Sequence, residues 1–137
     1  MNTIASGGVY RTPFFVCGSV DETDGTPLET LAHPQSKRVM SAENVALLRK
    51  MLCQVVEEGT AQDAAWLEEG AGGKTGTAQT GQFTPDGTER KNLWFTGFYP
   101  AQQPRYTIVV LQDGQVSTEH SSAAIFARLC AMLDLLA

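Results

Sequence analysis

The sequence predicts an α+β domain: an antiparallel sheet of about three main strands carries a C-terminal helix on one face, and a second helix precedes the first strand. Two observations support this architecture. Three strand-like segments follow one another in the second half of the chain, separated by turn residues. Apolar residues recur at helical spacing in two further segments, one before the first strand and one after the last. Consecutive strands with short connections form a meander, and an amphipathic helix covers one face of such a sheet.

Length and composition indicate one globular domain. The chain has 137 residues, of which 42% are hydrophobic and 18% charged, which is ordinary for a folded protein. The formal net charge of −5 argues against nucleic-acid binding. No apolar run is long enough to span a bilayer, and the first sixteen residues lack the features of a signal peptide. The chain itself is therefore expected to be soluble, without a leader or an anchor.

Cysteine and histidine are too few and too scattered for a metal site. Cys17, Cys53 and Cys130 are widely spaced, no C-x-x-C pair is present, and the only histidines are His33 and His120. We expect buried or free thiols, no metal and no cofactor.

The N-terminal third contains few predicted elements. Gly7-Gly8 is typical of a helix C-cap, although almost no helix precedes it. The apolar, β-rich segment 13–20 predicts a short strand. Residues 21–27 contain Asp24-Gly25 and predict a turn, and residues 28–37 predict a loop.

The first long helix is predicted over residues 42–57. Ser41 is a favourable N-cap and Gly59 ends the helix. Residues 60–67 predict a further short helical turn, in which Trp66 is interpreted as a packing residue. The apolar face of the long helix consists of Val45, Leu48, Met51, Leu52, Val55 and Val56.

The three strands and the last helix follow. A strand carries Lys74, a polar loop over 80–91 turns at Pro85-Asp86-Gly87, and a second strand covers 93–99. After a tight connection, the nearly continuous apolar run 106–111 predicts a strand that is central or buried on both faces. Asp113-Gly114 predicts a turn, and a helix capped near Ser121 runs to Ala137. The core face of that helix consists of Ile125, Phe126, Leu129, Cys130, Leu133 and Leu136.

The stretch from Ala71 to Gln79 carries the candidate site. It places one cation between small residues and two hydroxyls just after it. In an extended strand Thr75 and Thr77 share one face, and Lys74 and Gly76 the other. Its three glycines let another backbone or a ligand come close. An ammonium, hydroxyl donors and free backbone N–H groups together suit a carboxylate or a developing oxyanion.

Two other interpretations of this stretch are a phosphate-binding loop and a glycine-rich edge strand. Gly73-Lys74-Thr75 matches the end of a Walker A motif, but the required earlier glycine is replaced by Glu68, and the following residues are poor helix formers. A phosphate loop is therefore rejected. A glycine-rich edge strand with an exposed lysine would be enough to explain the tripeptide Lys-Thr-Gly. The surrounding segments therefore decide whether the stretch is a binding site or only an edge strand.

The order of those segments resembles the C-terminal part of the transpeptidase domain of penicillin-binding proteins. It is most similar to the high-molecular-weight class B type that builds the septum or the spore wall. The segments that carry the resemblance are Ser6-Gly7-Gly8, Pro13-Phe14-Phe15-Val16, Met51-Leu52 with Val55 to Thr60, Gly73 to Gln79, Trp94 to Pro100, and Ala123 to Phe126. The resemblance implies that residues 1–137 form a single partial domain of the β-lactamase/transpeptidase-like fold.

The resemblance also implies roles for the strand. Lys74 would sit at the edge of an active site, and Thr75 and Thr77, with Gly76 between them, would bind the carboxylate of a D-Ala-D-Ala stem peptide or a β-lactam. The Thr77 backbone N–H would be one of two oxyanion donors, worth about 3–4 kcal/mol in comparable sites.

Two elements of the family are not found in the sequence. None of its seven serines is followed three residues later by lysine, so Ser-x-x-Lys is absent, and so is Ser-x-Asn. In the family both precede the Gly-Gly segment. We therefore expect a fragment of a peptidoglycan D,D-transpeptidase, inactive alone, whose parent works at the extracytoplasmic face of the bacterial membrane. The missing N-terminal part of the domain would be its partner.

Other functions stay open. The piece could act as a stand-alone binding or assembly module, or derive from a β-lactamase or a β-lactam sensor domain. A site built from His120 with Ser121 or Ser122 is disfavoured because adjacent residues at a helix start rarely form a working pair. The family's partner strand for 106–111 is absent, so the free apolar edge predicts a homo-oligomer.

Overall fold

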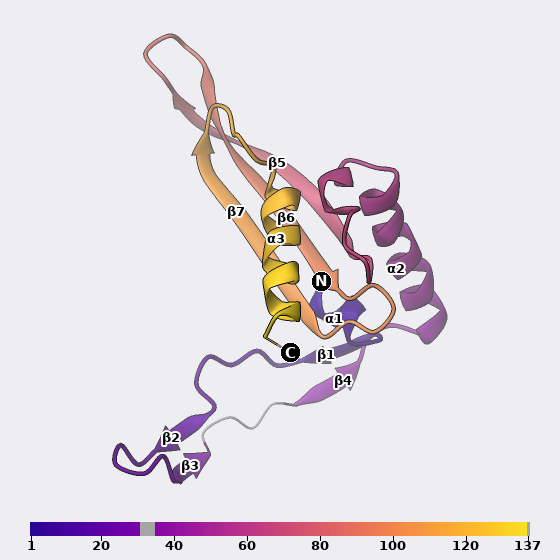
Figure 1. Cartoon of the computed structure of the whole chain (residues 1–137), viewed down its shortest axis with the longest axis vertical. Helices are drawn as coiled ribbons and strands as arrows, with labels where there is room; N and C mark the ends of the chain where they lie inside the picture. The colour runs from indigo at the N-terminus through magenta and orange to yellow at the C-terminus, as the bar shows by residue number, and fades with distance from the viewer. Residues whose placement is uncertain (31–34, 137) are drawn as a thin grey trace.

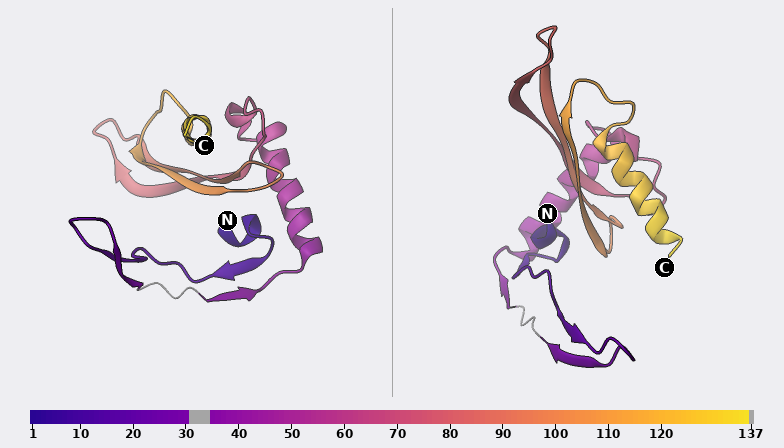
Figure 2. Two further views of the ribbon diagram at one scale, coloured as in Figure 1. Left: turned by 60° about the horizontal axis from the view of Figure 1, so that its bottom comes forward. Right: turned by 90° about the vertical axis from the view of Figure 1, so that its left-hand side faces the viewer.

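The fold is organised around a three-stranded antiparallel sheet. The computed structural model describes residues 1–30 and 35–136. Strands β5 (Gly72–Phe83), β6 (Glu89–Tyr99) and β7 (Tyr106–Gln115) lie in the order β5-β6-β7. Helix α3 (Ser122–Asp134) lies across one face of this sheet, and the short helix α1 (Asn2–Ala5) lies on the other (Figures 1 and 2). The predicted α+β architecture is confirmed.

Helix α2 (Ala42–Glu57) has the predicted bounds. The Ser41 hydroxyl accepts a hydrogen bond from the Asn44 N–H at 3.2 Å, which satisfies one of the free donors at the helix start. A Cβ at Gly59 would lie 2.8 Å from the Val55 carbonyl oxygen, so only glycine lets the chain turn this closely after the helix. The predicted short helical turn is the 3₁₀ helix η1 (Gln62–Ala64).

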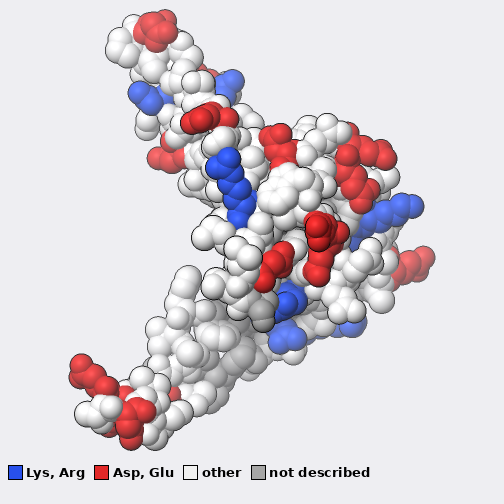
Figure 3. All heavy atoms as spheres, in the orientation of Figure 1, with Lys and Arg blue, Asp and Glu red and all other residues white. Residues whose placement is uncertain are grey.

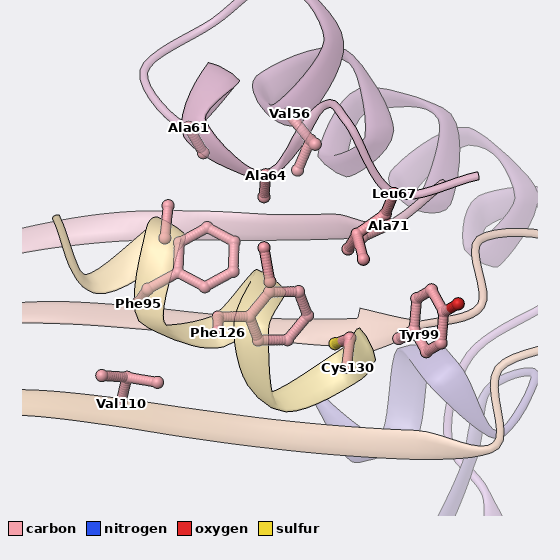
Figure 4. Close-up of a cluster of buried hydrophobic side chains, with 12 residues drawn as sticks. Val56, Ala61, Ala64, Leu67, Ala71, Phe95, Tyr99, Val110, Phe126 and Cys130 are labelled. Carbon is pink, nitrogen blue, oxygen red and sulfur yellow. The ribbon is translucent and has the colours of Figure 1, made fainter. Parts of the chain in front are cut away.

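The core lies between the sheet, α3 and the segment from the end of α2 to β5 (Figure 4). Phe95 of β6 and Phe126 of α3 are fully buried and meet edge to face, with ring centroids 4.8 Å apart. Such a pair adds about 0.5–1.5 kcal/mol beyond the area it buries. Small residues at Ala61, Ala64 and Ala71 let the connecting segment pack closely against the rings.

The predicted apolar faces of the helices are wider than the faces the structure buries. The exposed fraction is 51% for Met51, 39% for Leu129 and 83% for Leu136. The predicted packing of Trp66 is also wrong, because its side chain is exposed. Spacing identifies the centre of a buried stripe, whereas the elements that pack on it determine its width. Helix α3 ends at Asp134, and Ala137 lies outside the described residues.

The described residues between Val9 and Arg38 form an arm that projects from the sheet (Figure 2). Its two strand pairs are antiparallel, β1 with β4 and β2 with β3. Their bounds are β1 Val9–Arg11, β2 Gly18–Val20, β3 Pro27–Thr30 and β4 Ser36–Arg38.

The strand predicted over 13–20 is wrong except at its end. Residues 13–17 lie outside any strand, and the Phe15 side chain is fully exposed. The loop predicted over 28–37 is also wrong where it overlaps β3 and β4. Gln35 lies outside any strand, and residues 31–34 lie outside the described part of the chain. Strand pairing, which sequence spacing does not report, decides both cases.

The loop predicted over 80–91 is shorter than expected, because β5 runs to Phe83 and β6 begins at Glu89. The turn at Pro85-Asp86-Gly87 is confirmed, with Gly87 at φ +83°. Hydrogen bonds from Thr84 and Thr88 to the Asp86 carboxylate hold its pKa below the ordinary value.

Strand β7 is an edge strand, so the prediction of a central or doubly buried strand is wrong. Val110 is buried against the core, whereas its neighbour Val109 is 61% exposed. The turn predicted at Asp113-Gly114 is a β-bulge within β7, where these two residues oppose the single residue Asn92. Gly114 has φ +60°, and its N–H donates to the Asn92 side-chain oxygen at 2.8 Å.

Candidate carboxylate-binding strand

The candidate residues lie on the first half of β5, at an edge of the sheet. Among the described residues, β5 pairs only with β6, and Lys74 is opposite Thr96 while Thr75 is opposite Phe95. Phe95 belongs to the core beneath α3, so Thr75 and Thr77 lie on that face and Lys74 on the other, as the alternation predicts. On such an edge, alternate backbone N–H and C=O groups point away from the sheet.

Two glycines ahead of Lys74 make room for aromatic rings. A Cβ at Gly72 would lie 2.3 Å from the Phe98 ring, and a Cβ at Gly73 would lie 2.3 Å from the Phe95 ring. Of the two expectations for these glycines, close approach of another backbone holds at Gly73, where the added Cβ would lie 2.8 Å from the Thr96 backbone oxygen. Close approach of a ligand is wrong for both, because the chain's own side chains fill the space. Gly76 differs: its nearest neighbour would be the Trp94 Cβ at 3.5 Å, an ordinary contact.

Lys74 is exposed and folds back on its own strand. Its Nζ donates to the Thr75 carbonyl oxygen at 3.0 Å and lies 3.4 Å from the Thr75 Oγ1. Strand β6 occupies one edge of β5, so the Lys74 side chain can reach the Thr75 carbonyl only if that carbonyl points to the unpaired edge. The backbone groups of Thr75 therefore point outward, and those of Thr77, two residues on, point the same way.

The two threonine hydroxyls have different surroundings. The Thr75 Oγ1 lies 2.8 Å from the Thr60 Oγ1, in the segment that follows α2. Thr77 is exposed, and its hydroxyl has no hydrogen-bond partner within the described part of the chain. The structure thus gathers an ammonium, one engaged hydroxyl, one free hydroxyl and an outward N–H on one edge. Sequence reasoning did not identify Thr60, because a separation of fifteen residues in sequence carries no signal of contact.

Charges on the face shown in Figure 3 are distributed unevenly. Acidic side chains gather at the tip of the β5–β6 hairpin, at the far end of the arm and over the region of α2, whereas basic side chains are scattered. Across residues 1–30 and 35–136, no three His, Cys, Asp or Glu side chains are grouped closely enough to hold a metal ion.

The cysteines are free thiols in three environments. Cys17 is exposed, Cys53 is half-buried and Cys130 is fully buried. Burial raises the pKa of the Cys130 thiol to about 12, which keeps it neutral. Nearby, burial and a hydrogen bond to the Asp134 carboxylate raise the pKa of Tyr99 well above its ordinary value.

The structure does not assemble a serine–histidine site at the start of α3. The Ser121 hydroxyl donates to the Asp63 carboxylate at 2.5 Å and accepts from the Ala124 N–H at 3.1 Å. The Ser122 hydroxyl donates to the Leu93 carbonyl oxygen at 3.0 Å. Both serines therefore have structural roles, as a helix cap and as a link to β6.

Comparison with known proteins decides the family. Residues 1–131 match the model for the penicillin binding protein transpeptidase domain. The chain belongs to this family. Penicillin-binding protein 1F of Bacillus subtilis is 37% identical over 101 residues, covering 72% of the chain and 13% of that protein. Stage V sporulation protein D of Bacillus subtilis is 31% identical over 121 residues, covering 86% of the chain and 18% of that protein.

The fold agrees with the family. Penicillin-binding protein 3 of Mycobacterium tuberculosis, solved with aztreonam, superposes with a TM-score of 0.78 at 29% identity, covering 98% of the chain and 33% of that structure. The resemblance to class B penicillin-binding proteins and to their β-lactamase-like fold is confirmed. The chain spans less than a quarter of the curated relatives it matches. None of the described helices combines the length and apolar character that crossing a bilayer requires.

Proposed function

We propose that β5 is the carboxylate-binding wall of a peptidoglycan D,D-transpeptidase active site. The observation that carries the proposal is the unpaired edge of β5, where the Lys74 ammonium, the Thr77 hydroxyl and the outward Thr77 N–H lie together. Lys74, Thr75 and Thr77 hold the terminal carboxylate of a D-Ala-D-Ala stem peptide, or that of a β-lactam. Gly76 keeps the edge free of a side chain where the ligand lies against it.

The chemistry is acyl transfer. A serine hydroxyl attacks the carbonyl of the penultimate D-Ala, the terminal D-Ala leaves, and an amine of a neighbouring stem then takes the acyl group from the serine. The oxygen of each tetrahedral intermediate carries negative charge, which the outward Thr77 N–H stabilises. No Ser-x-x-Lys or Ser-x-Asn is present in the sequence, so we assign the nucleophile to another part of the domain and expect the chain alone to be inactive.

The parent protein's setting follows from the same proposal. Peptidoglycan stem peptides lie outside the bacterial membrane, so the parent acts at its extracytoplasmic face. Residues 1–137 then form one partial domain, completed by the rest of the transpeptidase domain. A relative solved with aztreonam supports β-lactam binding by the complete site.

Benzylpenicillin tests the proposal in two ways. The intact mass of the chain after incubation with excess benzylpenicillin should be unchanged, and an adduct on any serine would contradict the assignment of the nucleophile elsewhere. Nuclear magnetic resonance titration with the same compound should shift the Lys74–Thr77 signals. The methyl ester, which has no carboxylate, should not shift them. Equal shifts with acid and ester would contradict a carboxylate receptor.

A stand-alone binding or assembly module is a second candidate, favoured by the exposed edge of β7. Val109 and Leu111 are exposed there, and the run 106–111 contains no lysine or proline to discourage pairing. We expect this edge to pair with a second copy when the chain is isolated. A monomer by sedimentation velocity at high protein concentration would contradict this.

A further inference from the structure

The hydroxyl of Thr75 is held from two directions. Thr60, in the turn that follows α2, places its Oγ1 2.8 Å from the Thr75 Oγ1. Lys74 places its ammonium 3.4 Å from the same oxygen, on the opposite face of the strand. Both contacts lie near the protein surface, because Thr75 is half-buried and Thr60 is exposed.

The number of protons on these groups limits how they can be arranged. An ammonium only donates, whereas a hydroxyl has one proton to donate and two lone pairs that accept. If Thr60 donates to Thr75, the Thr60 and Lys74 protons occupy both lone pairs of the Thr75 oxygen. The Thr75 proton then points in the one remaining direction. If Thr75 donates to Thr60 instead, it has no proton left for a ligand.

We propose that Thr60 is a positioning residue that makes the Thr75 hydroxyl a donor toward the ligand carboxylate. A carboxylate accepts hydrogen bonds and cannot donate, so only the first arrangement binds it. The two strand hydroxyls then differ in kind: Thr77 rotates freely until a ligand arrives, whereas Thr75 is oriented beforehand. This inference rests on the proposed function of β5 and adds a residue from outside that strand.

Two variants at position 60, compared with the wild type, test the orientation without ligand. Thr60→Val removes the hydroxyl and keeps the shape, and Thr60→Ser keeps the hydroxyl. Three-bond couplings to the Thr75 side chain report its χ1 rotamer. We expect one rotamer in the wild type and in Thr60→Ser, and rotamer averaging in Thr60→Val. An averaged Thr75 in the wild type, or an unchanged rotamer in Thr60→Val, would overturn the proposal. Far-ultraviolet circular dichroism checks that each variant is folded.

Binding tests the consequence. Loss of one oriented hydrogen bond should weaken noncovalent benzylpenicillin binding to Thr60→Val by about two- to tenfold. Thr60→Ser should restore it. The methyl ester of benzylpenicillin should bind all three proteins equally. In the double variant with Thr75→Val, the change at Thr60 should have no further effect, because the hydroxyl it orients is gone.

The outcomes separate the two proposals. A Thr60→Val loss that is equal for acid and ester, or one that adds to the Thr75→Val loss, would mean that Thr60 acts through general packing, and would overturn the positioning role. A wild type that shows one Thr75 rotamer but no carboxylate-dependent binding would contradict the proposed function of β5. The ligand-free result would still support the contact itself.

Discussion

The two halves of the Ala71–Gln79 stretch use glycine for opposite reasons. Gly72 and Gly73 lie beneath the rings of Phe98 and Phe95, and an added Cβ at either position would lie 2.3 Å from a ring atom. At Gly76, three residues later, an added Cβ would make only an ordinary contact, 3.5 Å from the Trp94 Cβ. The first half is thus part of the core, while the second half belongs to the surface proposed to bind a carboxylate. Substitutions in the first half should change stability, and those in the second half should change binding.

The largest expected effect is on the ring that covers Gly73. Phe95→Ala removes a fully buried ring that meets Phe126, so the free energy of unfolding should fall by about 3–5 kcal/mol. Urea unfolding followed by circular dichroism measures it. A loss below about 1 kcal/mol would mean that the first half of the stretch is not packed as described.

Gly73→Ala should destabilise by about 1–3 kcal/mol, because its Cβ overlaps the Phe95 ring. The same substitution in a Phe95→Ala background should cost much less, since the obstructing ring is gone. Equal costs in the two backgrounds would show that ring contact does not explain this glycine.

High pH should weaken the packed side of the sheet. The pKa of Cys130 is about 12 in the folded chain against an ordinary value of 9.0, so the unfolded chain loses its thiol proton first as pH rises. The stability that the buried, neutral thiol contributes is intact below pH 9 and is lost as pH rises toward 12, with a loss of about 1–2 kcal/mol at pH 10. Urea unfolding between pH 7 and pH 10 measures it, with Cys130→Ala as the control. A variant with the same pH dependence as the wild type would contradict this cause.

Gly76→Ala is the matched substitution in the open half. Its free energy of unfolding should change by less than about 1 kcal/mol, in either direction, because the new Cβ makes only an ordinary contact with the Trp94 Cβ at 3.5 Å. Benzylpenicillin binding should weaken, since the methyl group occupies the space beside the ligand. Unchanged binding would remove Gly76 from the proposed site.

Lys74→Ala should have the smallest effect on stability, within about 0.5 kcal/mol, because the side chain is exposed and contacts only its own strand. Its effect on carboxylate binding should be the largest of the strand, through loss of the one ammonium there. Lys74→Arg distinguishes charge from shape. A Lys74→Ala chain that binds benzylpenicillin as well as the wild type would contradict the receptor role.

Local signals account for what could be predicted. Helix α2 has its predicted bounds because Ser41 caps it and Gly59 follows it, and both act within one turn of the chain. The three strands of the sheet and the turn at 85–87 are also local features. Predictions failed where strand pairing decides the outcome: in the arm, in the length of the β5–β6 hairpin and at the bulge at Gly114. Residue spacing does not report which strands pair or where the pairing ends.

The sequence by itself determined the elements of the second half, their order, the family resemblance and the Lys74–Thr77 edge as the candidate site. These are properties of neighbouring residues, and spacing and side-chain chemistry record them. Only the tertiary structure separated the glycines that admit rings from the one that leaves space, and only it brought Thr60 within 2.8 Å of Thr75. The physical reason is that contacts across a fold depend on packing, which local spacing does not encode.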